Sequence, residues 1–285
     1  MRFDGTHNPG EHQVIVPTPP QVILPERKVI GAKEAAKWHA TRGGAVAADA
    51  DPVLLADLVA GWALTAGPQQ TLDSTGVIAS GPRDLTSTGD MSFSSSGARF
   101  PGTQYPPTGY MSHPNNSVFN MAGSDWELEF IYKIPSTVIE QNYLFGKLFG
   151  SQPGENDQLL VRVFHDTLGG PNSIDILVCD GAVSNFVTAS APREQFNYVG
   201  VWYTASTKTL SIQINGGTVQ NKVLTTGMSN TDGVLAFGYD SYEDGCDGWL
   251  KYVRLWIGSL KTDSRTWRYN AGAGRTDAEV AAYTG

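Results

Sequence analysis

The chain has little cysteine, no clustered positive charge and no long apolar run. Two cysteines, Cys179 and Cys246, are too few for a disulfide framework, so two free thiols in a reducing compartment are expected. No apolar run approaches the roughly 18 residues of a membrane-spanning helix. The longest basic run is Arg27-Lys28, and the formal net charge is −8. We therefore expect no nucleic-acid partner and no membrane insertion.

Several motifs of export and catalysis are also missing. Met1 to Leu24 lacks the basic start and the continuous apolar segment of a secretory signal, which predicts cytoplasmic synthesis without a signal peptide. The chain contains no phosphate-binding glycine loop and no G-x-S-x-G motif. Its five histidines are scattered and show no metal-ligand spacing.

What is present favours a turn-rich β protein. The chain of 285 residues contains 32 glycines and 16 prolines, and 40% of its residues are hydrophobic, which is enough for a packed core. This length suits one large β-sandwich with extra segments, or two small domains.

Residues 1–31 differ from the rest because prolines alternate with β-branched residues. Proline prevents pairing inside a sheet, yet the segment is too apolar for a solvated linker. We expect an extended N-terminal arm that binds another chain. Its contact residues are predicted to be Val14, Ile15, Val16, Val22, Ile23 and Leu24. Short helices are predicted at 32–42 and 49–60, and residues 32–54 form the connector.

From about Gly61 onward, alternating patterns separated by turn signals predict strands. Trp126, Leu128, Phe130 and Tyr132 alternate with polar residues and predict a strand with one packed face. Further strands are predicted at 143–149, 159–164, 173–179, 185–189, 198–203, 209–214, 233–237 and 249–256.

Five segments in order carry a resemblance to a known family. They are residues 58–64, 72–85, 93–102, 199–216 and the ending Gly248, Leu250, Lys251, Val253, Arg254, Leu255, Trp256, Tyr269, Asn270 and Gly272. Together they resemble laminin-G/concanavalin A-like domains, although the family's acidic residue at the Lys251 position and its usual turn are missing. The resemblance implies an all-β, concanavalin A-like jelly-roll sandwich of two antiparallel sheets at 55–272, followed by a tail at 273–285.

One strand carries carboxylates at alternate positions, namely Asp125, Glu127 and Glu129. It is superficially similar to the catalytic strand of laminarinase-like glycosidases, but the order and the spacing differ. We expect a solvated strand face, no catalytic residue and no enzymatic activity.

Two kinds of ligand site are candidates. Asp240, Asp244 and Asp247 lie in an acidic loop that could hold calcium, the one candidate cofactor, or could form a plain hydrated turn. Tyrosines in predicted loops are candidates for stacking on sugar rings, namely Tyr105, Tyr110, Tyr239 and Tyr242. Trp126, Trp202 and Trp256 are predicted to be core residues.

These features support more than one function. The main hypothesis is a non-enzymatic virion structural protein, for decoration of a phage head or tail, anchored through its arm to other virion proteins or to copies of itself. The alternative is a carbohydrate-binding module or host-glycan adhesin, whose partner is a surface glycan. A glycoside hydrolase is the third hypothesis.

Overall fold

The computed structural model describes residues 54–102, 108–135, 142–147, 158–164, 172–179, 184–192, 194–229, 233–239, 245–258 and 260–283. All of them belong to the unit Ala48–Gly285. The predicted arm at 1–31, its contact residues Val14 to Leu24, and the predicted helix at 32–42 lie outside the described residues.

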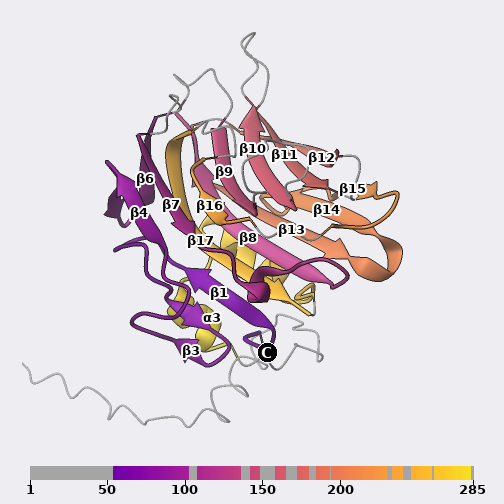
Figure 1. Ribbon diagram of the computed structural model, residues 1–285, viewed down its shortest axis with the longest axis horizontal. Helices are drawn as coiled ribbons and strands as arrows, with labels where there is room; N and C mark the ends of the chain where they lie inside the picture. Colours follow the sequence, from indigo (N-terminus) through magenta and orange to yellow (C-terminus); the bar gives the residue numbers. More distant parts are fainter. Residues whose placement is uncertain are drawn as a thin grey trace, which may run out of the picture. The chain divides into compact units, whose positions relative to one another are not determined.

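A ten-stranded antiparallel sheet forms one layer of the fold (Figure 1). Its main path runs in the order β15-β14-β13-β8-β17-β1-β2-β3, and β6 pairs with both β17 and β5. The strands are β1 (Leu58–Trp62), β2 (Leu72–Asp73), β3 (Gly76–Val77), β5 (Ser92–Ser94), β6 (Gly97–Gly102), β8 (Trp126–Lys133), β13 (Asn197–Thr204), β14 (Thr209–Ile214), β15 (Gln220–Val223) and β17 (Cys246–Ile257).

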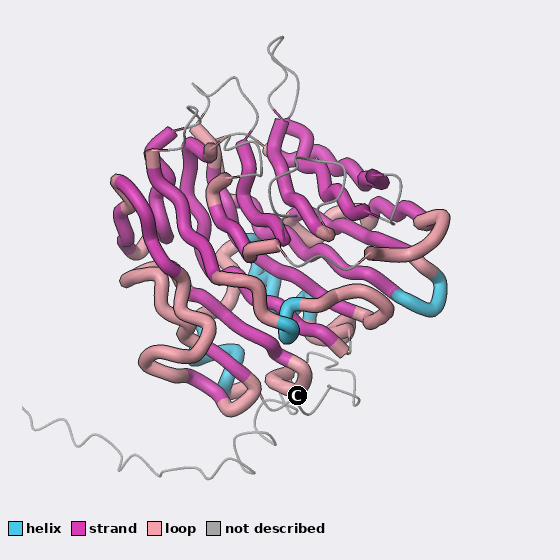
Figure 2. Tube along the Cα trace, viewed as in Figure 1, coloured by secondary structure: helices cyan, strands magenta, loops and turns pink. Residues whose placement is uncertain are grey.

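A seven-stranded antiparallel sheet forms the second layer, in the order β12-β11-β10-β9-β16-β7-β4. The strands are β4 (Thr86–Gly89), β7 (Gly109–His113), β9 (Asn142–Lys147), β10 (Leu159–Phe164), β11 (Asn172–Cys179), β12 (Ser184–Ala191) and β16 (Leu235–Phe237). Among the described residues, helical structure is confined to short pieces outside the strands (Figure 2). These are η1 (Ser117–Phe119), η2 (Ala205–Thr207), α2 (Arg265–Tyr269), η3 (Asn270–Gly272) and α3 (Asp277–Ala281).

The core lies between the two sheets, because alternate residues of each strand point inward. Trp62 from one sheet meets Phe237 from the other edge-on, with ring centroids 5.3 Å apart. Phe145 packs against the same Phe237 ring at 5.1 Å. The predicted all-β jelly-roll sandwich of two antiparallel sheets is confirmed. No helix of the described part is long and apolar enough to cross a membrane.

Strand β17 organises the ten-stranded sheet. It pairs with β8 along one side, and with β6 and then β1 along the other. A register shift between Lys251 and Arg254 separates these two halves. Tyr252 adopts a φ of 52° at this bulge and donates its N–H to the carbonyl of Ala63 at 3.1 Å. The bulge therefore turns the strand between its two partners.

The predicted helix at 49–60 is wrong over its second half, because Leu58–Trp62 form β1. Asp57 has a φ of 62°, which a helix does not allow. The helical spacing of the leucines has another cause: Leu54 and Leu58 both pack against Trp256. Burial against a sheet therefore overrides the local pattern.

The C-terminal segment, residues 260–283, packs on the sandwich rather than trailing from it. Helix α3 begins with a capping box, in which the Thr276 hydroxyl accepts from the N–H of Glu279 and the Glu279 carboxylate accepts from the N–H of Thr276. Val280 of this helix is fully buried in a cluster with Leu54, Leu58, Leu72 and Trp256.

Candidate functional site

The outer face of the seven-stranded sheet carries an aromatic surface. Tyr110 on β7 points outward because its neighbour Met111 is fully buried in the core. The Tyr110 and Tyr239 rings lie 4.5 Å apart at an angle of 53°. Tyr239 also packs beside Tyr143, Leu160 and Ala236. We call Tyr110, Tyr143 and Tyr239 the tyrosine face. Tyr110 and Tyr239 are its partly exposed members, and Tyr143, which is 6% exposed, packs beside them.

Backbone pairing holds the tyrosine face in place. Tyr239 and Gly245 form an isolated antiparallel bridge on the two sides of the acidic loop. The carbonyl of Gly245 accepts a hydrogen bond of 3.3 Å from the N–H of Tyr143. Two of the tyrosines are therefore fixed by the same glycine.

Polar side chains lie next to this surface in register across three strands. Arg162 on β10 pairs with Tyr143 on one side and with Asp175 on the other, and Asp175 pairs with Thr188. Arg162 Nη2 lies 3.5 Å from Asp175 Oδ2, and the Thr188 hydroxyl donates to Asp175 Oδ1 at 2.6 Å. Arg162 Nε is buried and has no hydrogen-bond partner in the described part of the chain. An aromatic surface thus borders a donor and an acceptor.

Two of the four predicted glycan-binding tyrosines are brought together, namely Tyr110 and Tyr239. Tyr105 and Tyr242 lie outside the described residues, so their role stays a prediction. All three tryptophans are buried, but the core prediction is confirmed for Trp126 alone, which lies between the two sheets. Trp256 is buried on the outer side in the cluster with Leu54 and Val280, and Trp202 lies under the Arg265 guanidinium at 3.5 Å.

The prediction of a solvated carboxylate face on β8 is wrong. Glu127 and Glu129 are both 0% exposed. Glu129 receives Arg254 Nη1 at 2.7 Å, Glu127 receives Arg265 Nη2 at 2.9 Å, and Arg268 contacts both glutamates. The C-terminal segment covers this half of the outer face of the ten-stranded sheet, which is why its carboxylates are not solvated.

Further contacts complete this network, which we call the arginine–glutamate cluster. Asp277 of α3 accepts from Arg254 Nη2 at 2.7 Å, and the Tyr198 hydroxyl donates to Glu129. The backbone N–H of Lys261 donates to Glu127 at 2.9 Å. Three arginines therefore meet three carboxylates, and the cluster is balanced in charge.

The cluster sets the protonation of its members. Burial alone would raise the pKa of Glu127, but the positive charges and hydrogen bonds of Arg268 and Arg265 outweigh burial and lower its pKa from 4.5 to about 2. Burial, together with the charge of Glu129, raises the pKa of Tyr198. Because Glu127 is buried and its lowered pKa keeps it ionised at neutral pH, it cannot act as the acid of glycoside hydrolysis there.

The acidic loop is described only at its end. Asp240 and Asp244 lie outside the described residues. Asp247 forms an ion pair with Arg99, and its backbone N–H donates to Asn142 Oδ1 at 2.8 Å. Its carboxylate is thus engaged by a guanidinium, and calcium binding by the loop stays a prediction.

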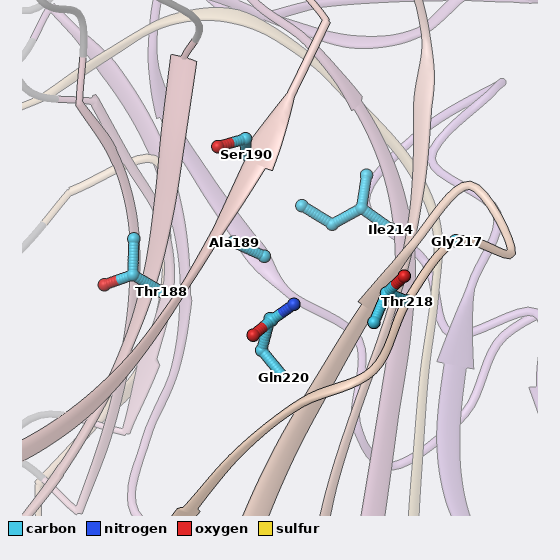
Figure 3. Close-up of a pocket in the computed structure, with 7 residues that line it drawn as sticks. All are labelled: Thr188, Ala189, Ser190, Ile214, Gly217, Thr218 and Gln220. Carbon is cyan, nitrogen blue, oxygen red and sulfur yellow. The ribbon is translucent and has the colours of Figure 1, made fainter.

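A groove of about 430 Å³ opens at the edge of the sandwich where β12 of one sheet faces β14 and β15 of the other (Figure 3). Ala189 and Ile214 point toward one another across it, and Gln220 points into the same space. Its remaining lining residues are Thr188, Ser190, Gly217 and Thr218. The groove has hydroxyl and amide groups but no aromatic ring or charged group among these residues.

Comparisons with known proteins identify the fold. No protein-family model matches the sequence, and no curated protein matches it. The binding domain of botulinum neurotoxin serotype D/C VPI 5993 is similar in structure, with a TM-score of 0.56 and 10% identity over 77% of this chain and 53% of that one. The binding domain of botulinum neurotoxin serotype C1 has a TM-score of 0.54 and 11% identity, over 76% of this chain and 53% of that one. A structure of botulinum neurotoxin type C has a TM-score of 0.55 and 10% identity, over 76% of this chain and 52% of that one.

This chain therefore spans about half of those structures. At such low identity the likeness supports the β-sandwich fold alone, a fold that carries many unrelated activities.

Proposed function

We propose that this chain is a non-catalytic carbohydrate-binding domain whose ligand site is the tyrosine face. The observation that carries the proposal is the contact between Tyr110 and Tyr239 on the outer face of the seven-stranded sheet, at 4.5 Å between ring centroids. A tyrosine ring offers a flat apolar surface to the C–H groups of a sugar, and its hydroxyl serves the polar edge.

The polar neighbours supply what the rings lack. A saccharide hydroxyl both donates and accepts, so it suits the Arg162 guanidinium, whose side chain is 23% exposed, and the Asp175 carboxylate, whose side chain is 10% exposed. Sites for small ligands combine apolar and aromatic surface with a few polar groups of this kind. The groove between β12 and β15 has no aromatic ring in its lining, so we assign the saccharide to the tyrosine face.

The similar structures favour the same class of ligand. One belongs to a study in which cell entry of botulinum neurotoxin type C depends on interaction with two ganglioside molecules, and gangliosides are glycolipids. A further D/C binding domain was solved in complex with SialylT, with a TM-score of 0.50 and 9% identity over 77% of this chain and 53% of that one. These domains bind rather than catalyse, in agreement with the buried and ion-paired state of Glu127 and Glu129.

The test is binding of the full chain to a panel of immobilised neutral and acidic glycans, followed by titration of the best ligand. Tyr239→Ala should lower the affinity at least tenfold. Tyr283→Ala is the matched control, because Tyr283 is also a partly buried tyrosine in a ring pair. Its ring lies 4.4 Å from that of Trp267, in the C-terminal segment that packs on the ten-stranded sheet. Equal affinities of the two variants, or no glycan bound by the natural protein, would sink the proposal.

The virion hypothesis has a separate basis, because it rests on residues 1–31. Attachment through this arm to a larger assembly stays a prediction, and so does virion localisation. A saccharide-binding domain is compatible with display on a particle but does not require it.

A further inference from the structure

A row of alternating cations and aromatic rings crosses the ten-stranded sheet. Arg99 on β6, Trp249 on β17 and Lys133 on β8 stand directly opposite one another in the strand register. The neighbouring row, Ala98, Leu250 and Tyr132, is fully buried in the core. Because side chains alternate between faces, the first row lies on the outer face.

The aromatic rings hold these cations in place. The Arg99 guanidinium lies 4.6 Å from the centre of the Trp249 ring, and the Lys133 ammonium lies 5.5 Å from the same ring. Lys133 and Lys251 also share the Phe196 ring, at 5.8 Å and 4.5 Å. Such contacts are favourable within about 6 Å of a ring centre and restrict flexible side chains to one region. We call Arg99, Lys133, Lys251, Trp249 and Phe196 the cationic stripe.

The stripe carries excess positive charge in an acidic protein. Its carboxylate neighbour is Asp247, which pairs with Arg99. Lys133 and Lys251 form no ion pair among the described residues. Burial lowers the pKa of Lys251, so its ammonium is partly desolvated without a neutralising partner. An anion placed here would relieve that cost, and the stripe is a distinct feature in a chain whose total net charge is −8.

The stripe lies beyond the part of the sheet that the C-terminal segment covers. Arg254 and Trp256 at the end of β17 lie beneath that segment and are 1% and 0% exposed. Gly274 packs closely on Ile131, and a Cβ at 274 would force the Ile131 side chain to shift. Beyond Ile131, Lys133 and Trp249 are partly exposed. The same outer face is thus closed at one end and accessible at the other.

We propose that the cationic stripe is a second binding site, which takes an acidic saccharide bearing sulfate or carboxylate groups. The choice of a saccharide rests on the proposed function, whereas the choice of an acidic one rests on the stripe. Lys133 and Lys251 supply point charges for two acidic groups, and Arg99 supplies donors from the far side of Trp249. Because Trp249 and Phe196 already contact cations, the rings position the charges, and acidic groups rather than ring stacking carry the affinity.

The test compares a sulfated dextran oligosaccharide with a neutral dextran oligosaccharide of equal length, titrated into the full chain at moderate salt. The natural protein should bind the sulfated probe more tightly, and added salt should weaken that binding. The double variant Lys133→Gln/Lys251→Gln should lose at least tenfold in affinity for the sulfated probe and show a shallower salt dependence.

The control is the double variant Lys208→Gln/Lys222→Gln, which removes two exposed lysines near the opposite edge of the same sheet and should bind within about twofold of the natural protein. Equal loss in both double variants means general charge attraction and overturns the proposal, as does unchanged binding by Lys133→Gln/Lys251→Gln. Tighter binding of a polyglutamate peptide than of the sulfated probe assigns the stripe to an acidic protein instead.

These results are independent of the test on the tyrosine face. Tyr239→Ala should leave the difference in affinity between the sulfated and the neutral probe unchanged, because Tyr239 belongs to the other sheet. Loss of that difference in Tyr239→Ala would contradict the proposal that the cationic stripe is a site separate from the tyrosine face.

Discussion

Glu127 and Glu129 lie on the outer side of β8, yet both are completely buried. Their environment follows from Arg254, Arg265 and Arg268, which come from the strand and helix that follow much later in the chain. Desolvating a charge costs several kcal/mol, so each charge needs a partner at close range. Single substitutions in the arginine–glutamate cluster should therefore lower the free energy of unfolding strongly.

Arg268→Met should destabilise the protein by about 3–5 kcal/mol, because it leaves Glu127 and Glu129 buried with fewer partners. Arg275→Met is the matched control. It breaks a pair with Glu279 that is 25% and 44% exposed and a hydrogen bond from Nε to the Trp267 carbonyl, and should cost at most about 2 kcal/mol. Urea unfolding of both variants measures the difference, and equal losses would contradict a structural role for the cluster.

The lowered pKa of Glu127 predicts acid sensitivity. A carboxyl group with a folded pKa of about 2 and an unfolded value of 4.5 stabilises the fold at pH values above 4.5. This contribution, about 3 kcal/mol, is lost as the pH falls from 4.5 toward 2. Unfolding free energies between pH 6 and pH 2.5 should decline, and the decline should be smaller in Glu127→Gln. An equal decline in the natural protein and in Glu127→Gln would contradict the assignment of the acid sensitivity to Glu127.

At the scale of elements, the C-terminal segment acts as a strap over the ten-stranded sheet. Arg254 of β17 contacts Asp277 of α3, and Val280 of the same helix enters an apolar cluster with Trp256. Helix α3 is too short to be stable alone, so its capping box and its packing must hold it.

Thr276→Ala should therefore cost about 1 kcal/mol, because it removes the side chain that caps α3. Thr266→Ala, at an exposed site in α2, should change stability by less than about 0.5 kcal/mol. Thermal or urea unfolding of the pair checks this, and an equal effect would show that the cap does not hold the strap.

The strands were the most predictable elements, for a physical reason. Alternation at Trp126 to Tyr132 and in the pair 198–203 and 209–214 reports burial on the core side, which the sequence contains locally. The strap could not be predicted, because the partners of Glu127 lie 138 and 141 positions away. Alternating carboxylates look solvated until the segment that covers them is placed.

The tyrosine face shows the same limit. Tyr110 and Tyr239 were recognisable as aromatic residues outside the core pattern. Their contact depends on the pairing of β7 with β16, as the approach of Arg162 to Tyr143 depends on the pairing of β10 with β9. Sequence spacing contains neither pairing, so Arg162 and Asp175 gave no signal. The cation and ring contacts of the cationic stripe likewise required the register of β6, β17 and β8.

At the scale of the whole molecule, the two sheets carry different surfaces on their outer faces. The outer face of the seven-stranded sheet carries the tyrosine face. The outer face of the ten-stranded sheet is covered by the strap at one end and carries the cationic stripe at the other. The two proposed saccharide surfaces are therefore separate, and both are supported by regular strands rather than by loops alone.

The most direct measurement is a map of backbone amide shifts by NMR while the best neutral glycan is titrated into the full chain. If the tyrosine face binds the glycan, the largest shifts should occur at Tyr110, Tyr143, Arg162 and Tyr239. Amides of the groove between β12 and β15, such as Thr218 and Gln220, should move little. Shifts concentrated in that groove, or spread over the ten-stranded sheet with none at the tyrosine face, would contradict the assignment of the saccharide site.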